Sequence, residues 1–350
     1  MAKIDHGQLI RKALMTGVSY VVPFVVAGGT IMSLALIFGG VEGVKVEGSM
    51  AYIIRQYGAA IMSLMVPIIA GYISYSLADR IGLAPGMAAG LVAVQTGGGF
   101  LGGLIGGLIA GYFMMYLKKI KVHRNLMGLM NFFVYPVVGS FVVGLIMLFV
   151  IGKPIGAINT GLVSWLKGLQ GINAILLGAI IGAMTCFDMG GPVNKAAYAF
   201  VIGAMGAGIG EPYASMKAAI SVPDFALALS TLLFPKFYTE EEIEAGKAAW
   251  VLGVAGITEG AIPFALADPL IVIPSMMVGG AIASAIAMYG GSSILTPGGG
   301  LFTLPLMKNV WVFIVAMVIG SLVSAALVSF LKGLKYRKKN GVKSVNNGGN

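Results

Sequence analysis

The stretch LAPGMAAGLVAVQTGGGFLGGLIGGLIAGYFMMYL, residues 83–117, contains no charged side chain. One helix of this length, at about 1.5 Å per residue, would be longer than the hydrocarbon core of a bilayer, which is about 30 Å thick. We therefore predict a break at residues 95–99 (QTGGG), which divides the stretch into a tight helical hairpin. In its second arm, Gly98, Gly102 and Gly106 recur at four-residue spacing, and this ridge of small residues predicts close contact with a neighbouring helix rather than randomly tolerated glycines.

The whole chain shares this apolar character. Of its 350 residues 58% are hydrophobic and 10% are charged, and its mean hydropathy is +0.92. Soluble domains carry about 25% charged residues, so a very apolar soluble protein is a weak alternative to a polytopic, all-α integral membrane protein. The 53 glycines are spread through the apolar runs, which favours tight packing and interrupted helices of the kind found in transporters.

The net charge of +10 is concentrated beside apolar segments, in basic clusters within residues 3–12, 118–124 and 332–343. The positive-inside rule places these clusters, and with them both termini, in the cytoplasm. This arrangement requires an even number of crossings, and we expect about ten helices, some of them re-entrant. A nucleic-acid interface is disfavoured because no soluble basic domain presents the charges. Residues 1–12 lack the apolar core of a cleaved signal peptide.

Apolar runs of spanning length recur along the chain. We expect membrane helices at residues 18–40, 59–77, 131–151, 171–187, 218–234, 271–289 and 311–330. Residues 235–247 (PKFYTEEEIEAGK) predict a polar loop. The predicted division of the chain is an N-terminal membrane domain (1–154), an interfacial amphipathic helix (155–170), a C-terminal membrane domain (171–334) and a basic cytoplasmic tail (335–350).

A first group of polar residues interrupts the apolar C-terminal half at residues 187–195, FDMGGPVNK. Glycine and proline end a helix here, so backbone amides and carbonyls become free. Asp188, Asn194 and Lys195 surround the break, and such a site at membrane depth suits a polar solute. The alternative is an Asp188–Lys195 ion pair that only stabilises the break.

A second group lies at residues 256–265, GITEGAIPFA, which we interpret as the tip of a re-entrant hairpin. Thr258 and Glu259 would face a polar cavity, where a carboxylate accepts hydrogen bonds from sugar hydroxyls; the alternative is that Glu259 caps backbone amides. A third segment, TPGGG, contributes Thr296 and Gly298 either to a pocket wall or gate or to a flexible connection. Asp268 precedes a proline and predicts a helix start.

Other chemistry is poorly represented in the chain. One cysteine, Cys186, excludes an intrachain disulfide, and two histidines offer no dense ligand cluster, so neither a metal nor a cofactor is expected. No serine or cysteine nucleophile motif and no Walker-type phosphate loop is visible. The open alternatives for a sugar-binding membrane protein are an ion-coupled secondary transporter, with Glu259 or Asp188 as the proton carrier, and, less favoured, an intramembrane enzyme.

Four segments carry a resemblance to a known family. The sequences FDMGGPVNKAAYAF (187–200), PKFYTEEEIEAGKAA (235–249) and GITEGAIPFALADPL (256–270), with the N-terminal GVSYVVPFVVAGG (17–29), resemble the enzyme IIC component of fructose-family phosphotransferase systems. The resemblance covers nearly the whole chain. It implies a dimerising N-terminal scaffold domain and a C-terminal transport domain, in which two re-entrant hairpins hold the sugar and move it like an elevator.

The same resemblance implies partners and site residues. Glu259 is expected to bind sugar hydroxyls, with Asp188 and Asn194 as further contacts. The expected partners are a hexose such as fructose, a separate IIB protein that phosphorylates it, a IIA protein acting through IIB, membrane lipid and a second copy of the chain. The permease itself would carry no phosphoryl-donor residue, since Cys186 lies in an apolar helix, and would reside in a bacterial plasma membrane.

Overall fold

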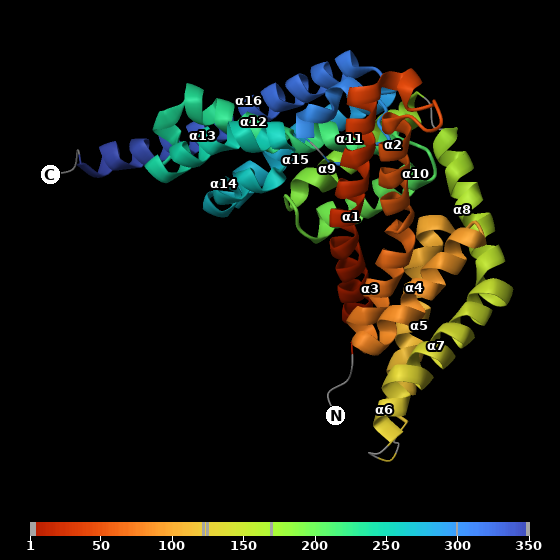
Figure 1. Ribbon diagram of the computed structural model, residues 1–350. Coiled ribbons are helices and arrows are strands. Elements are labelled where there is room, and N and C mark those ends of the chain that lie inside the picture. The colour runs from red at the N-terminus through yellow and green to blue at the C-terminus, as the bar shows by residue number, and fades with distance from the viewer. Residues whose placement is uncertain (1–4, 121–122, 124–125, 169–170, 299, 348–350) are drawn as a thin grey trace. The chain divides into compact units, whose positions relative to one another are not determined.

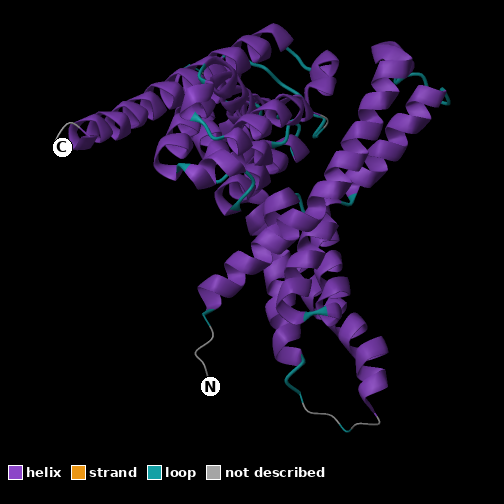
Figure 2. Cartoon of the chain, turned by 90° about the vertical axis from the view of Figure 1, so that its left-hand side faces the viewer, coloured by secondary structure: helices purple, strands orange, loops and turns teal. Residues whose placement is uncertain are grey.

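The computed structural model describes residues 5–120, 123, 126–168, 171–298 and 300–347, and these residues are almost entirely helical (Figures 1 and 2). Their one extended pairing is an isolated bridge between Ser293 and Lys308. Within these ranges, seven helices are long and apolar enough to cross a membrane. The predicted all-α membrane class is therefore confirmed, and the number of about ten crossing or re-entrant helices stays a prediction.

The chain divides into two compact units. The first unit comprises Met1–Gly168 and Ile202–Ile209, and the second unit comprises Leu169–Val201 and Gly210–Asn350. The predicted roles of the N-terminal and C-terminal domains are not decided by this division. Parts of the predicted basic clusters, namely residues 3–4, 121–122 and 124–125, lie outside the described residues, as does Gly299 of the TPGGG segment.

The first unit is a set of packed helices. They are α1 (His6–Gly43), α2 (Met50–Ser63), α3 (Met65–Ala78), α4 (Arg80–Gln95), α5 (Gly99–Leu117), α6 (Met127–Leu129), α7 (Tyr135–Leu145) and α8 (Gly152–Lys167). The predicted break of the uncharged stretch is confirmed, since α4 ends at Gln95 and α5 begins at Gly99. Between α6 and α8 the chain stays helical through two π-helical segments, Met130–Val134 and Ile146–Ile151, so the predicted span and interfacial helix follow each other without a loop.

The glycine ridge of α5 brings two helix backbones together. A Cβ atom placed on Gly107 would lie 2.7 Å from the carbonyl oxygen of Ala70 in α3, and one on Gly103 would lie 2.7 Å from a methyl carbon of Val66. Gly103 and Gly107 lie beside the predicted ridge; on the ridge itself, a Cβ on Gly102 would lie 2.9 Å from Cβ of Ala93 and one on Gly106 3.2 Å from Cβ of Ala89, both in α4. The predicted role of these glycines in close helix contact is confirmed, because no larger side chain fits at Gly107 without moving the backbone.

The second unit contains longer helices and shorter, interrupted ones. They are α9 (Ile172–Phe187), α10 (Pro192–Gly206, whose last residues belong to the first unit), α11 (Glu211–Ile220), α12 (Val222–Leu233), α13 (Glu240–Ala255), α14 (Ile262–Ala267), α15 (Pro269–Tyr289) and α16 (Val310–Asn347). Helix α15 packs against both α9 and α16. Small residues permit this, since a Cβ on Gly178 would lie 2.7 Å from the carbonyl oxygen of Ser284, and one on Gly320 would lie 2.7 Å from Ala283.

The prediction of a polar loop at residues 235–247 is wrong, because helix α13 begins within it. Thr239 accepts a hydrogen bond from the amide of Glu242, and the Glu242 carboxylate accepts one from the amide of Thr239, at 3.2 and 2.8 Å. This reciprocal pair is a capping box, and acidic residues in a first turn also suit the helix dipole. The sequence TEEE carries this signal, since a threonine followed three residues later by glutamate is the pattern of a capping box, although its polarity is also typical of a loop.

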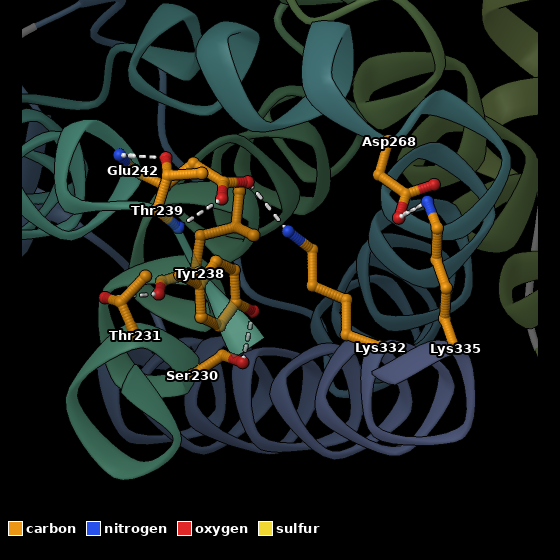
Figure 3. A network of polar contacts seen from close by, with 9 residues as sticks. Ser230, Thr231, Tyr238, Thr239, Glu242, Asp268, Lys332 and Lys335 are labelled. Atoms are coloured by element: carbon orange, nitrogen blue, oxygen red, sulfur yellow. Dashed lines mark hydrogen bonds and ion pairs between the residues drawn. The ribbon is translucent and has the colours of Figure 1, made fainter. Parts of the chain in front are cut away.

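Two lysines of α16 form ion pairs with acidic residues elsewhere in the second unit (Figure 3). Lys332 and Glu242 form an ion pair of 2.7 Å with both side chains less than 10% exposed, and Lys335 pairs with Asp268 at the same distance. Burial, together with the nearby Glu242 charge, raises the pKa of Tyr238 to about 12, although its hydrogen bond with Ser230 opposes this. Asp268 directly precedes α15, as predicted for a helix start.

Candidate functional site

The first interrupted segment lies between α9 and α10, where Gly190 adopts a φ of 106° that favours glycine. The carboxylate of Asp188 accepts hydrogen bonds from the amides of Val193 and Asn194, at 2.6 and 2.9 Å. Asp188 therefore caps the first turn of α10, and no ion pair between it and Lys195 is found within the described residues. The ammonium group of the half-buried Lys195 is therefore available to bind a partner other than Asp188.

Asn194 is buried and joins the two helices across this break. Its side-chain amide donates a hydrogen bond of 2.7 Å to the carbonyl oxygen of Thr185, one of the free carbonyls near the end of α9. A helix end buried in an apolar environment needs such a partner, because an unpaired carbonyl is costly. Asp188 and Asn194 thus hold the shape of the segment.

The second interrupted segment follows α13, and the residue that caps the end of this helix, Gly256, has a left-handed φ of 72°. A short 3-10 turn, Thr258–Ala261, then leads into α14. Thr258 is buried and its hydroxyl lies 3.5 Å from Oε2 of Glu259, whereas the Glu259 side chain is exposed. Among the described residues Glu259 accepts no hydrogen bond from a backbone amide, so the capping alternative is not supported by its contacts.

The three predicted segments meet in the second unit. A Cβ atom placed on Gly190 would lie 2.9 Å from Oε1 of Glu259, so the carboxylate rests against the bare backbone of the first segment. A Cβ placed on Gly256 would lie 2.9 Å from Cα of Gly300, which joins the second segment to the third. Residues far apart in the sequence therefore bring an accessible carboxylate and three backbone turns to one place.

The third segment is held by buried polar groups of α11. The amide of Gly298, which has a φ of 75°, donates to the hydroxyl of Tyr213 at 2.7 Å, and its carbonyl accepts from Nζ of Lys217 at 2.8 Å. Lys217 also donates to the hydroxyl of Thr303. Thr296 is buried as well. These contacts argue against the alternative of a flexible connection at this position.

Sequence reasoning missed two charged residues near these segments. Lys217 is 4% exposed and pairs only with neutral oxygens among the described residues. Asp224 is fully buried in α12, and neither of its carboxyl oxygens has a hydrogen-bond partner there. It lies against Gly260, where no Cβ atom would fit beside its Oδ1. The missed signal was a lone ionisable residue inside an apolar run, which is expensive in a membrane and therefore informative.

This arrangement is suited to binding a polyhydroxylated solute. An exposed carboxylate beside a threonine hydroxyl can accept two hydroxyl hydrogen bonds, and hydrogen bonds to an ionised group are the stronger kind. The described residues contain no group of three histidine, cysteine or acidic side chains able to hold a metal ion. Cys186 is buried and lies 3.5 Å from the carbonyl oxygen of Ala219, so it packs within the helices.

Comparison with known proteins gives consistent relatives. Residues 15–279 match the family model for the phosphotransferase system, EIIC. The chain is 41% identical over 334 residues to the fructose-like permease IIC component 2 of Escherichia coli (strain K12), with 95% of this chain and 92% of that protein covered. It is 38% identical over 346 residues to the fructose-specific EIIC component of Haloferax volcanii, with 92% of each covered.

Longer relatives match over part of their length. The chain is 45% identical over 306 residues to the 2-O-alpha-mannosyl-D-glycerate-specific EIIABC component of Escherichia coli, with 86% of this chain but 46% of that protein covered. It is also 45% identical to the fructose-specific EIIB'BC component of the same organism, with 57% of that protein covered. The chain thus spans about half the length of these relatives, whose names include EIIA or EIIB components.

Proposed function

The chain belongs to the EIIC family of the phosphotransferase system, and we propose that it carries fructose or a fructose-like hexose across the membrane for phosphorylation by a separate IIB protein. The family and the membrane class together exclude a soluble role. Relatives named as fructose-specific or fructose-like support the substrate class, and the relatives that name EIIA and EIIB components support the partners.

The observation that carries the proposal is the contact between two interrupted segments. The Glu259 carboxylate is accessible and lies against Gly190, and the buried Thr258 hydroxyl lies beside it. Hydroxyl groups of a hexose would replace the lost hydration with hydrogen bonds to Glu259 and Thr258. Among the other candidates, Lys195 and Thr296 belong to the same three segments and are further proposed substrate contacts. Gly298 positions the third segment, because its amide and carbonyl already bind Tyr213 and Lys217.

Asp188 and Asn194 act in this proposal by positioning. Their polar atoms already bind backbone groups of α9 and α10, so they fix the position of Gly190 against which Glu259 rests. A sugar would then meet a site whose shape is set in advance, which lowers the entropy lost on binding.

Transport in this proposal is an elevator movement of the second unit. The support is that the chain forms two compact units and that all three interrupted segments lie within one of them, so a bound sugar would move with that unit. The chain would lie in a bacterial plasma membrane with both termini in the cytoplasm, where the basic clusters place them, and would work as a homodimer. Phosphorylation by IIB at the cytoplasmic side would trap the sugar.

The site is tested by Glu259→Gln, which keeps the shape of the side chain and removes its charge. We expect at least a tenfold loss of hexose affinity, because hydrogen bonds to charged groups contribute about 1.5–3 kcal/mol. The measurement is thermal stabilisation of the purified protein by a panel of hexoses. Glu244→Gln is the matched control, because Glu244 lies on the exposed surface of α13 and forms an ion pair with Lys247, its one ion pair among the described residues. Normal binding by the Glu259 variant would show that the site is elsewhere.

The reaction class is tested by the energy source of uptake. A phosphotransferase permease takes up labelled hexose only when phosphoenolpyruvate and the general phosphotransferase proteins are present, and the product is a sugar phosphate. An ion-coupled transporter would instead lose uptake when the proton gradient is discharged and would deliver free sugar. Uptake that persists without the phosphotransferase proteins would contradict the proposed function.

A further inference from the structure

A groove of about 510 Å³ runs along α16 on the second unit, between this helix, α12 and the short turn Pro235–Phe237. Its α16 wall is a stripe of apolar residues at four-residue spacing, Leu322, Ala326, Phe330 and Leu334, all of them exposed. At about 1.5 Å per residue this stripe is roughly 18 Å long. The volume is within the range of about 300–1,000 Å³ typical of small-molecule sites.

The apolar groove has a charged end. Arg337 lines it one turn beyond the last residue of the stripe. Phe237, which also lines the groove, stacks on Phe234 with ring centres 5.8 Å apart, and the ammonium of Lys236 lies 5.4 Å from the Phe237 ring centre. Phe237 lies against Gly333 and Tyr336 of α16, so this ring marks the end of the groove at which Arg337 lies. The exposed Lys236 lies beside the same ring, and apart from Arg337 the lining residues are apolar except Ser329.

These cations differ from the other basic residues of the same region. Lys332 and Lys335 of α16 each have their own carboxylate, Glu242 and Asp268, as Figure 3 shows. Arg337 and Lys236 have no carboxylate partner among the described residues. One end of the groove thus carries positive charge that the described part of the chain does not neutralise. An anion with an apolar tail would complement both this charge and the apolar wall of the groove.

We propose that this groove binds one anionic phospholipid, with an acyl chain along the α16 stripe and the phosphate against Arg337 and Lys236. Helix α16 is one of the helices long and apolar enough to span a membrane, so lipid is the solvent of its exposed face. A guanidinium group binds a phosphate through two parallel hydrogen bonds. Tyrosine is favoured at the level of lipid headgroups, and the ring centre of Tyr336 in α16 lies 5.5 Å from that of Phe237. The site is independent of the proposed sugar site.

The charge requirement is tested by native mass spectrometry of the full-length purified protein. Phosphatidylglycerol and phosphatidylcholine with identical acyl chains are added in turn, and inorganic phosphate is the headgroup control. We expect phosphatidylglycerol to bind in preference to phosphatidylcholine, and inorganic phosphate not to compete at the same concentration. The double variant Lys236→Gln and Arg337→Gln should lose this preference, by about five-fold for each cation removed.

Lys338→Gln is the matched control. Lys338 is exposed and adjacent to Arg337, but it neither lines the groove nor lies over one of the lining rings. Lys338→Gln therefore removes the same single charge as Arg337→Gln alone and, unlike that variant, should leave the preference intact. An equal loss in both variants would overturn the proposal in favour of general attraction to a basic helix end. Equal binding of the two lipids by the unmodified protein, or competition by inorganic phosphate alone, would overturn it as well.

The apolar requirement is tested by filling the groove. Ala326→Trp places an indole ring in the channel and should remove binding of phosphatidylglycerol, whereas Val315→Trp, on an exposed part of α16 outside the groove, should not. The same spectra report the oligomeric state. If Ala326→Trp instead dissociates an oligomer without changing lipid binding, the groove receives a second copy of the chain and the lipid proposal is wrong.

Discussion

Glycine is abundant both in helix α5 and at the three interrupted segments of the second unit, but it serves opposite purposes. In α5 the glycines from Gly102 to Gly111 keep helical geometry, are buried, and touch the backbone of α3 at Gly107. At the interrupted segments Gly190, Gly256 and Gly298 have φ values of 106°, 72° and 75°, and each ends or redirects the chain. One set removes side chains so that helices can pack, and the other removes side chains so that the backbone can turn.

The residues next to these glycines indicate which of them contribute to function. The glycines of α5 stand among leucine, isoleucine and other apolar residues, and the helix contains no charged residue. The interrupted segments place Asp188, Thr258 and Glu259 beside their glycines, so a turn in the backbone coincides with side chains that bind polar groups. Substitutions in the two sets should therefore fail in different ways, the first in stability and the second in binding.

The largest effect is expected for Gly107→Leu in α5. The Cβ atom alone would lie 2.7 Å from the carbonyl oxygen and 2.8 Å from Cα of Ala70, and backbone atoms cannot give way as a flexible side chain can. Overpacking typically costs about 1–3 kcal/mol and more where helices must separate. We expect loss of most folded protein after detergent extraction, measured by the monodisperse fraction in size-exclusion chromatography and by the thermal unfolding midpoint.

Gly144→Leu provides the control for this variant. Gly144 is in α7, a helix of the same unit, and a Cβ there meets nothing within 4 Å. It should keep the yield and the unfolding midpoint of the unmodified protein. Equal losses in both variants would mean that any glycine-to-leucine change in a membrane helix destabilises this protein, and that the contact of Gly107 with α3 is not the cause.

An intermediate effect on stability, with a large effect on binding, is expected for Gly190→Ala. A residue with a side chain in the left-handed region costs about 1–2 kcal/mol, and the new methyl group would lie 2.9 Å from Oε1 of Glu259. Displacement of that carboxylate should lower hexose affinity at least tenfold. The measurement is thermal stabilisation by hexose, as for the Glu259 variant.

The control separates backbone strain from displacement of the carboxylate. Gly208 has a φ of 80° and open space around it, so Gly208→Ala carries a similar conformational cost without a clash. It should lower the unfolding midpoint by a similar amount and leave hexose affinity unchanged. If both variants lose affinity equally, the contact between Gly190 and Glu259 does not define the site.

Local chemistry made much of the fold and part of the site predictable. Helix boundaries around the QTGGG break, and the interruptions at residues 188–191 and 256–261, follow from glycine and proline acting on their own neighbours. The capping box at Thr239 was equally local, and the polarity of its acidic residues concealed it. These features depend on a few adjacent residues, so a sequence displays them directly.

Contacts between distant segments could not be derived in the same way. The meeting of Gly190 with Glu259, and the bonds from Lys217 to Gly298 and Thr303, depend on how helices pack. Small residues permit a close approach without saying which helix approaches. The groove along α16 was hidden for the same reason, since its second wall comes from α12 and the turn after it.

The smallest effect is expected for Asp224→Asn. Asp224 is a buried carboxyl group inside a continuous helix, in contrast to Asp188 and Glu259, which lie beside glycine breaks. Asp224 lies inside α12, is fully buried, and neither oxygen has a partner among the described residues. Because the amide has the same shape and a neutral group is cheaper to bury than an ionised one, the free energy of unfolding should change by less than about 1 kcal/mol or rise. Hexose affinity, measured by the same thermal shift, should be unchanged, since no solute reaches this side chain. A tenfold loss of affinity would instead show that Asp224 contributes to sugar binding, through its contact with Gly260. In that case a carboxylate inside an unbroken membrane helix could act on substrate without a glycine break beside it.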